Sequence, residues 1–256
     1  MIEEAFLHFK RVGKKTLERL KGYGIQNWYD VLKLQNTNVI SKNLVNSLVE
    51  EIHFYLDVLE TENISCLVNN FKGEDKWRIL GRYFDRLSYF DIETDGLGYD
   101  SRITLIVCYH KGRLYEFVRH ENLEGFLDLL NDIELLVSFN GQSFDVPWVR
   151  HAFHIPELPC PHIDLRWVCK KIGLEGGLKS IEWDLGIQRP SDLIGVGGYE
   201  AVLLWDRWER WNDVEAKRKL IRYCSADVLS LQIVTAKVLK LQGLEVYITE
   251  DAFRLL

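Results

Sequence analysis

The sequence predicts a mixed α/β layer fold preceded by a small helical domain. Apolar residues recur at helical spacings over residues 1–59 and as short strand-like runs from residue 85 onward. Three such runs follow one another without a helix, whereas a helical pattern precedes the fourth. We therefore expect three antiparallel strands and then a parallel one. Beyond residue 143 the chain is mostly helical, so helices are expected to flank the mixed β-sheet.

The predicted domain boundaries follow these changes in pattern. A helical domain, a connector, an α/β domain and a C-terminal tail are expected at residues 1–60, 61–84, 85–240 and 241–256, respectively. The connector is predicted because Asn69-Asn70 and residues 72–76 are polar and turn-forming.

The composition indicates a packed protein. Hydrophobic residues make up 47% of the 256 positions and aromatic residues 12%, which suffices for a large core. The five cysteines are scattered without a C-x-x-C pair, a usage typical of reduced thiols. The N-terminus lacks the basic start and apolar core of a signal peptide, and no apolar stretch reaches the ~18 residues of a membrane span. We therefore expect a cytoplasmic protein with no membrane partner.

The net charge of −6 does not indicate a nucleic-acid binder, but the N-terminal charges are uneven. Residues 10–21 carry six basic side chains and one acidic one. Residues 9–20 resemble a helix-hairpin-helix motif, in which the amides of a helix N-terminus bind a backbone phosphate. Arg11 stands where that motif usually has its first glycine. The predicted backbone-binding residues are Lys10, Arg11, Gly13, Lys14 and Lys15. The alternative is a helical cap with a solvated basic face.

The first predicted strand, residues 87–93, ends in two carboxylates. Asp91 and Glu93 are two apart, so on a strand they point to the same face. Closely grouped carboxylates on a rigid element are suited to a hard divalent cation. With 38 acidic residues in the chain, about five such pairs are expected by chance. Two solvent-facing charges at a strand end are therefore the alternative.

The following segments extend the predicted sheet. Residues 102–110 and Arg113–Val118 form a hairpin through Lys111-Gly112. Residues 121–130 form an amphipathic helix. The short apolar run 134–139 comes after that helix, so we expect it to join the sheet in parallel.

A second candidate site lies where the fourth predicted strand ends. Asn140 and Gly141 form a turn, and a helix is expected to begin at about Ser143, whose side chain would cap it. Asp145 then falls in the first helical turn. Asn140 offers an amide for hydrogen bonds, and Phe144 offers a ring on which a base can stack. In the alternative, Asp145 only complements the helix dipole.

A third candidate site lies on a late helix. Tyr223 and Asp227 are four residues apart and so share one face of that helix. About one such pair is expected by chance in this composition. A partly buried tyrosine bonded to an exposed acid is therefore the alternative.

These motifs occur together in the order found in a known family. The chain resembles the tyrosine-containing (DEDDy) branch of the DEDD exonucleases, which belong to the ribonuclease-H-like superfamily. More closely, it resembles the YprB-type ribonuclease-H-like proteins, through residues 162–166, 173–182 and 185–189. Several members also carry a helix-hairpin-helix front end. The resemblance covers residues from about 5 to 240.

The resemblance implies a ribonuclease-H-like fold and a metal-dependent 3′–5′ exonuclease acting on single-stranded nucleic acid, with DNA favoured over RNA. It implies two Mg²⁺ or Mn²⁺ ions, and Tyr223 would orient the attacking water or help to deprotonate it. The implied metal ligands are Asp91, Glu93, Asp145 and Asp227. The implied substrate-binding residues are Thr94, Asp95, Gly96, Leu97, Asn140, Phe144 and Lys179. Asp95 departs from relatives, which often have threonine, and is expected to add a charge near the metals.

Two other functions stay open: a nucleic-acid-binding module whose site no longer catalyses, and a structure-specific endonuclease on the same fold. A non-catalytic scaffold would rest only on the N-terminal helices. Lys179 and Arg189 suit either backbone phosphates or a solvated or ion-paired role.

Two further residue groups carry weaker signals. A zinc site is conceivable among His151, His154, Cys160, His162 and Cys169, although their spacing matches no standard module and a structural role is favoured. Trp205, Trp208 and Trp211 suit either a stacking platform for nucleic acid or a helix face that packs on the core or covers the site as a lid.

Overall fold

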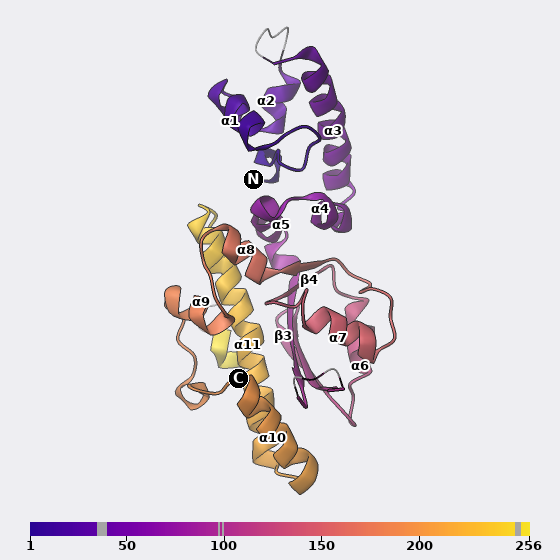
Figure 1. Ribbon diagram of the computed structural model, residues 1–256, viewed down its shortest axis with the longest axis vertical. Helices are drawn as coiled ribbons and strands as arrows, with labels where there is room; N and C mark the ends of the chain where they lie inside the picture. Colours follow the sequence, from indigo (N-terminus) through magenta and orange to yellow (C-terminus); the bar gives the residue numbers. More distant parts are fainter. Residues whose placement is uncertain (35–39, 97, 99, 249–251) are drawn as a thin grey trace. The chain divides into compact units, whose positions relative to one another are not determined.

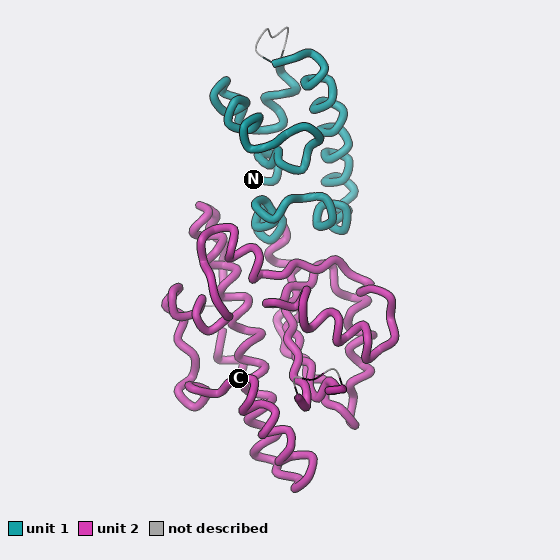
Figure 2. Tube along the Cα trace, in the orientation of Figure 1, with its two compact units in different colours: residues 1–82 teal, residues 83–256 magenta. Residues whose placement is uncertain are grey.

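The computed structural model describes residues 1–34, 40–96, 98, 100–248 and 252–256 (Figure 1). The chain forms two compact units, residues 1–82 and 83–256 (Figure 2). The first unit is helical and the second is α/β, which is the order that the sequence predicts.

The first unit packs its helices around an aromatic core. Its elements are η1 (Ile2–Glu4), α1 (Lys14–Gly22), α2 (Trp28–Leu32), α3 (Lys42–Glu60), α4 (Ile64–Asn70), η2 (Gly73–Asp75) and α5 (Lys76–Arg82). Asn27 begins α2 with a capping box, because its side chain accepts the amide of Asp30 at 3.1 Å. Trp28 is fully buried, and its Nε1 donates to the carbonyl of Ala5 at 2.6 Å.

The segment 61–84, predicted as a polar connector, instead carries α4 and α5, and the first unit extends to Arg82. The apolar residues of these helices are buried, among them Leu67 on α4 and Ile79 on α5. Each helix has only seven residues. Its periodicity is therefore too short to stand out against the turn-forming residues on either side.

The second unit is built on a five-stranded mixed sheet in the order β3-β2-β1-β4-β5. Its strands are β1 (Leu87–Thr94), β2 (Ile103–His110), β3 (Arg113–Val118), β4 (Leu135–Ser138) and β5 (His162–Asp164). The pairs β1–β2 and β2–β3 are antiparallel, whereas β1–β4 and β4–β5 are parallel. The predicted mixed sheet is confirmed. Strand β5 was not among the predicted strands, because its three residues form a strand only by pairing with β4.

Helices cover both faces of this sheet (Figure 1). The elements of these layers are η3 (Phe84–Arg86), α6 (Gly125–Leu130), α7 (Asp145–Ala152), α8 (Leu165–Lys171), α9 (Leu178–Asp184), η4 (Ser191–Leu193), α10 (Gly198–Trp211), α11 (Val214–Leu241) and η5 (Ala252–Leu255). Phe90 and Ile92 join the core cluster that includes Phe126 of α6 and Val149 of α7. Because side chains alternate along a strand, Asp91 and Glu93 face the opposite side, where α11 lies.

Three predicted boundaries differ from the observed ones. The helix expected over residues 121–130 begins at Gly125, and the helix expected from about Ser143 begins at Asp145. Phe144 precedes α7, and no side chain caps this helix. Part of the segment expected as a C-terminal tail packs back: Ala252 is buried, and Arg222 Nη1 donates to the carbonyl of Leu256 at 2.9 Å.

Candidate active site

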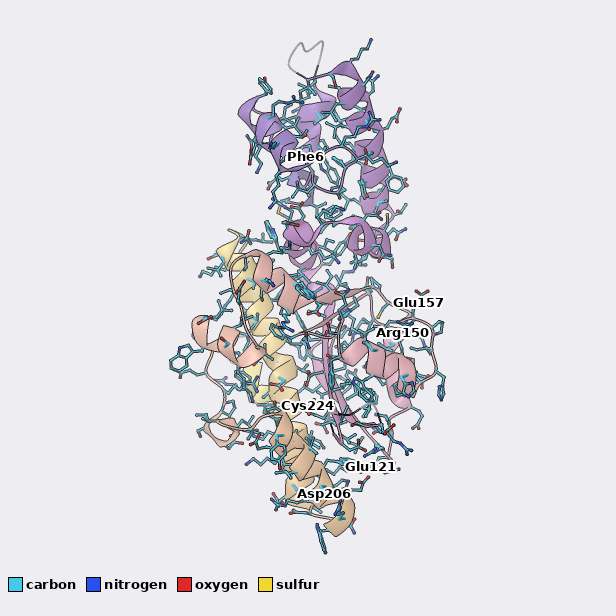
Figure 3. The ribbon with its side chains drawn as sticks, in the orientation of Figure 1. Phe6, Glu121, Arg150, Glu157, Asp206 and Cys224 are labelled. Carbon is cyan, nitrogen blue, oxygen red and sulfur yellow. The ribbon has the colours of Figure 1, made fainter. Side chains whose placement is uncertain are left out.

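Asp91 and Glu93 share one face of β1, as their spacing predicts. Their carboxylate oxygens and the Sγ of Cys224 all lie within 4.8 Å of one another. Cys224 lies on α11 beside the sheet (Figure 3), and its Sγ is 3.5 Å from Asp91 Oδ2. The pairing of β1 with β2 shifts between Glu93 and Thr94, so an irregularity lies directly after the second carboxylate, at the last residue of the strand.

Asp145 brings α7 to the same end of β1. Its side chain is 2% exposed, and its Oδ1 accepts the amide N–H of Ile92 at 3.2 Å, between the two carboxylates of the strand. Gly141 makes this approach possible. A Cβ at Gly141 would lie 1.8 Å from Ser138 Oγ and 3.2 Å from Asp145 Oδ2. Only glycine fits where the turn passes under the Asp145 carboxylate.

The turn between β4 and α7 is held by Asp164 at the end of β5. Its carboxylate accepts the amides of Asn140, Gln142 and Arg166 at 2.8, 3.0 and 3.0 Å. The Asn140 side chain, predicted to contact substrate, accepts from Arg166 Nη1 at 2.5 Å. Asn140 also has a φ of +67°, which asparagine tolerates better than most residues. Asp164 is thus a positioning residue, and strand β5 puts it next to the turn.

Tyr223 and Asp227 supply the corner on α11. Both are buried, with 5% and 8% exposed surface, on the part of α11 that packs on the sheet. Lys179, from α9, places its Nζ 5.1 Å from the centre of the Tyr223 ring and donates to the carbonyl of Val196. The charge of Lys179 lowers the pKa of Glu93, against the larger effect of burial. Lys179 therefore lies close enough to the acids to act on them.

Asp227 is ion-paired with Arg189, which is one of the two roles considered for that arginine. The same guanidinium is bonded to both carboxylate oxygens of Glu182, with Nε at 3.0 and 2.8 Å and Nη2 at 2.7 Å. Glu182 was not singled out from the sequence. In the sequence, Glu182 is the last residue of the family-like tract 173–182. Its burial on α9 is visible only in the structure.

Burial and mutual repulsion raise the pKa values of the four acids. For Asp91 and Glu93 burial is the largest cause, and the neighbouring carboxylates add to it. Burial raises the pKa of Asp145 to about 7. Burial also raises the pKa of Asp227, but the positive charge of Arg189 opposes that rise. A cation among these carboxylates would favour their ionised forms.

The residues that follow β1 are engaged in the structure of their own turn. Thr94 Oγ1 donates to the carbonyl of Gly96 at 2.7 Å. Asp95 accepts the amide of Arg102 and the guanidinium of Arg119, both at 2.7 Å. The charge of Asp95 is thus paired, whereas we had expected it to add to the charge near the metals. Leu97, also predicted to bind substrate, lies outside the described residues.

Phe144 directly precedes Asp145 and packs against the core cluster that includes Phe90 and Val149. It is half-buried, and its ring meets the ring of Trp148 edge-on, with 6.0 Å between centres. Part of the Phe144 side chain therefore stays accessible beside Asp145, as stacking on a base requires.

The basic stretch of the first unit forms the predicted turn and helix. Arg11 adopts a φ of +64°, the left-handed conformation that a glycine would favour there. Gly13 precedes the first residue of α1, Lys14. The amide of Lys10 donates to the carboxylate of Glu51 at 3.1 and 3.2 Å. Lys10, Arg11, Gly13, Lys14 and Lys15 are all exposed.

The histidine and cysteine group does not assemble as a metal site. Among the described residues, the one group with ligand atoms close enough is Asp91, Glu93 and Cys224. His162 Nε2 is instead 2.8 Å from Ser138 Oγ, and His162 belongs to β5 rather than to a loop.

The three tryptophans of α10 do not form one platform. Trp205 is 2% exposed and packs under the Arg119 guanidinium, 4.9 Å from its ring centre. Trp208 lies beneath Lys217 Nζ at 4.7 Å, and Trp211 is 76% exposed. A spacing of three residues rotates successive side chains around the helix, so the three rings face different surroundings.

A family model described as RNase_H superfamily matches residues 88–239, more than half of the chain. The chain belongs to the RNase H superfamily. Membership of the RNase H superfamily agrees with the mixed sheet and supports a nuclease activity in general; nucleases of this kind generally use divalent metal ions. Within the described residues, no helix combines the length and apolar character needed to cross a bilayer.

The chain is also similar to a curated protein and to solved structures. Uncharacterized protein YprB of Bacillus subtilis (strain 168) is 31% identical over 197 residues, which cover 67% of this chain and 46% of YprB. This chain thus matches less than half of the length of YprB. The family B DNA polymerase from the hyperthermophilic archaeon Pyrobaculum calidifontis has 18% identity and a TM-score of 0.48, covering 60% of this chain and 24% of the polymerase. The Aedes aegypti Nibbler EXO domain has 13% identity and a TM-score of 0.42, covering 68% of this chain and 87% of the EXO domain chain. No residue role follows from these two structures.

Proposed function

We propose that this chain is a metal-dependent 3′–5′ exonuclease that hydrolyses single-stranded nucleic acid, preferentially DNA. One observation carries the proposal: in an RNase H superfamily chain, three elements far apart in sequence gather acids at one end of β1. Asp91 and Glu93 come from β1, Asp145 from α7, and Tyr223 and Asp227 from α11.

The carboxylates of this site fit the divalent metal ions that such hydrolysis requires. Carboxylate oxygens are the ligands preferred by Mg²⁺ and Mn²⁺, and buried acids with raised pKa values favour a cation between them. Asp91, Glu93, Asp145 and Asp227 would hold two such ions. When bound, the ions supply an activated water and stabilise the leaving 3′ oxygen.

Tyr223 and Lys179 have distinct parts in this proposal. Burial and the charges of Asp227, Glu93 and Asp91 raise the pKa of Tyr223, so its hydroxyl keeps its proton at neutral pH. Tyr223 would orient the attacking water or, once bound cations offset the carboxylate charges, help to deprotonate it. Lys179 carries a positive charge beside the Tyr223 ring and is placed to receive the charge of the scissile phosphate.

A cavity beside α7 offers a place for the substrate strand. It has a volume of about 620 Å³ and is lined in part by Arg102, Arg119, Trp148 and His151. Trp148 and His151 belong to α7, the helix that also carries Asp145. Trp148 supplies a ring for base stacking, with Phe144 beside it, and the exposed Arg102 suits a backbone phosphate, whereas Arg119 is already paired with Asp95.

In the first unit, we propose that the turn at Arg11 and the start of α1 bind the nucleic-acid backbone. The exposed side chains of Lys10, Lys14 and Lys15 surround this helix N-terminus, where backbone amides favour an anion. This contact would retain a strand without reading its sequence.

The test follows digestion of end-labelled single strands of DNA and RNA in Mg²⁺ or Mn²⁺. The expected result is stepwise shortening from an open 3′ end, with DNA faster than RNA, and no cleavage after EDTA. A strand blocked at its 3′ end should survive, whereas a 5′ block should have no effect. Asp91→Asn removes a ligand charge with little change in volume and should abolish shortening. Asp206→Asn, on α10 outside the site (Figure 3), is the matched control and should retain it.

The same assay separates the alternatives. Cleavage of a circular single strand would indicate an endonuclease. A protein that binds the strand equally well with and without EDTA, and never shortens it, would be a binding module without catalysis. Either result contradicts the proposed exonuclease.

A further inference from the structure

One of the four acids already has a cation. Arg189, in the segment between α9 and η4, has an 8% exposed side chain and is ion-paired with Asp227, whose side chain is 11% exposed. Asp91, Glu93 and Asp145 have no comparable ion pair within the described residues. A metal ion that binds Asp227 must therefore compete with a positive charge, which is not so at the other three acids.

Glu182 anchors the same guanidinium. Its 5% exposed carboxylate accepts Arg189 Nε and Nη2 in the two-pronged geometry that suits arginine, while Nη2 also pairs with Asp227. A lysine ammonium could not serve both acids in this planar arrangement. Because all three groups are buried, removing the arginine alone would leave two carboxylates uncompensated, whereas removing Glu182 leaves Arg189 and Asp227 as a balanced pair.

We propose that Arg189, anchored by Glu182, is an internal counter-ion of the metal centre. It holds the Asp227 carboxylate in place before metal binds, and it competes with the divalent cation for that carboxylate. This inference rests on the proposed function, because it requires that Asp227 be a metal ligand. Arg189 is thus a positioning residue that sets how strongly the site binds its ions.

The counter-ion role predicts opposite effects for two variants. In Glu182→Gln, the Arg189 guanidinium is no longer shared between two carboxylates. It therefore pairs more strongly with Asp227. Divalent ions should then bind more weakly. In the double variant Arg189→Gln/Glu182→Gln, the cation and its anchor are removed together, and Asp227 is left without its counter-ion. Divalent ions should then bind more tightly, because a neighbouring positive charge no longer opposes them.

The experiment measures Mn²⁺ binding by titration calorimetry and the melting temperature with and without Mn²⁺, on the full chain. Relative to the parent, the double variant should bind Mn²⁺ about tenfold more tightly. It should melt at a lower temperature without metal and show a larger rise with metal. Glu182→Gln should bind Mn²⁺ several-fold more weakly. The matched control Arg210→Gln/Asp206→Asn removes an exposed pair on α10 and should leave both quantities unchanged.

Unchanged Mn²⁺ affinity in both variants, or a shift in the same direction in both, would overturn the counter-ion role while leaving the proposed function standing. A parent protein that binds no Mn²⁺ would overturn both. If the double variant does not fold, Glu182→Gln alone decides, since a purely structural Glu182 predicts no weakening of Mn²⁺ binding in a folded variant.

Discussion

The candidate sites of the two units are assembled in different ways. In the first unit, the residues proposed to bind a nucleic-acid backbone lie together at Lys10–Lys15, at one turn and one helix start. In the second unit, Asp91, Asp145 and Asp227 come from β1, α7 and α11. The first site needs only local geometry, whereas the second depends on the packing of a whole unit. A change in the second unit's core should therefore disturb its site, whereas the first site should respond mainly to changes within the stretch itself.

The two units also differ in the buried ionisable groups that bear on their stability and on their candidate sites. His8 lies among Phe9, Tyr55 and Phe71, and neither of its ring nitrogens has a hydrogen-bond partner among the described residues. Burial, assisted by the charge of Lys72, lowers the pKa of His8 to about 3. Burial raises the pKa values of the acids in the second unit instead. One unit thus keeps a base neutral, and the other concentrates acids that favour a cation.

The largest effect should come from Asp227→Asn. This change removes a proposed metal ligand and the partner of Arg189 with little change in volume, so cleavage should fall by roughly a hundredfold or more. The measurement is the initial rate on a 3′-labelled single strand, with circular dichroism to verify folding. Lys14→Gln in the first unit should change the rate at saturating substrate by less than about twofold. A comparable loss in both variants would break the distinction between the two sites.

Gly141→Ala tests how closely the second unit's site is packed. The added Cβ would lie 1.8 Å from Ser138 Oγ, and Ser138 is buried within β4, so the turn must shift. We expect a loss of about 3 kcal/mol in the free energy of unfolding, measured with denaturant, together with lost activity. The control is Gly198→Ala at the start of α10, where a Cβ meets no atom within 4 Å. A Gly141→Ala protein as stable as this control would contradict the geometry of the turn.

The lowered pKa of His8 predicts that the first unit becomes less stable as the pH falls. The folded-state pKa of His8 lies below the unfolded one, so protonation favours the unfolded state. Stability is therefore full above the unfolded pKa near 6.5 and is lost as the pH falls toward about 3. Between about pH 7 and about pH 5 the loss should be about 2 kcal/mol. Hydrogen exchange of the α3 amides would measure it. In His8→Phe this dependence should disappear, and its persistence would assign the effect to other groups.

The smallest effect should come from Arg11→Gly. Glycine relieves the left-handed strain but adds freedom to the unfolded chain, so stability should change by less than about 1 kcal/mol. Affinity for single-stranded DNA should fall about threefold, and the dependence of affinity on salt should decrease by about one charge. The measurement is fluorescence anisotropy at several salt concentrations. Lys33→Gln, an exposed lysine elsewhere in this unit, is the control and should leave the affinity unchanged.

Local patterns were sufficient where an element has a long, regular period. The apolar runs of β1 and β2 and their hairpin partner β3 were predicted nearly to the residue, and the spacing of Asp91 and Glu93 assigned them to one face. The short helices α4 and α5 were missed, because seven residues hold too little periodicity.

Strand β5 and the partners of the acids could not be predicted from local patterns. Strand β5 exists only through its pairing with β4, and that pairing brings Asp164 to the turn before α7. Arg189 and Glu182 lie in the family-like tracts and Cys224 lies next to Tyr223, but the contacts of these residues with the acids depend on α9 and α11 packing beside β1.

By itself, then, the sequence determined the order of helical and α/β parts and the main strands, because periodicity acts over a few residues. The resemblance to a family, and not local spacing, implied which acids share a site. Only the tertiary structure decided that Asp95 is paired with Arg119, that Asp227 already has a cation in Arg189, and that Arg11 takes a glycine's conformation. Burial and charge pairing depend on what the folded chain brings together, and these contacts join residues that no local pattern connects.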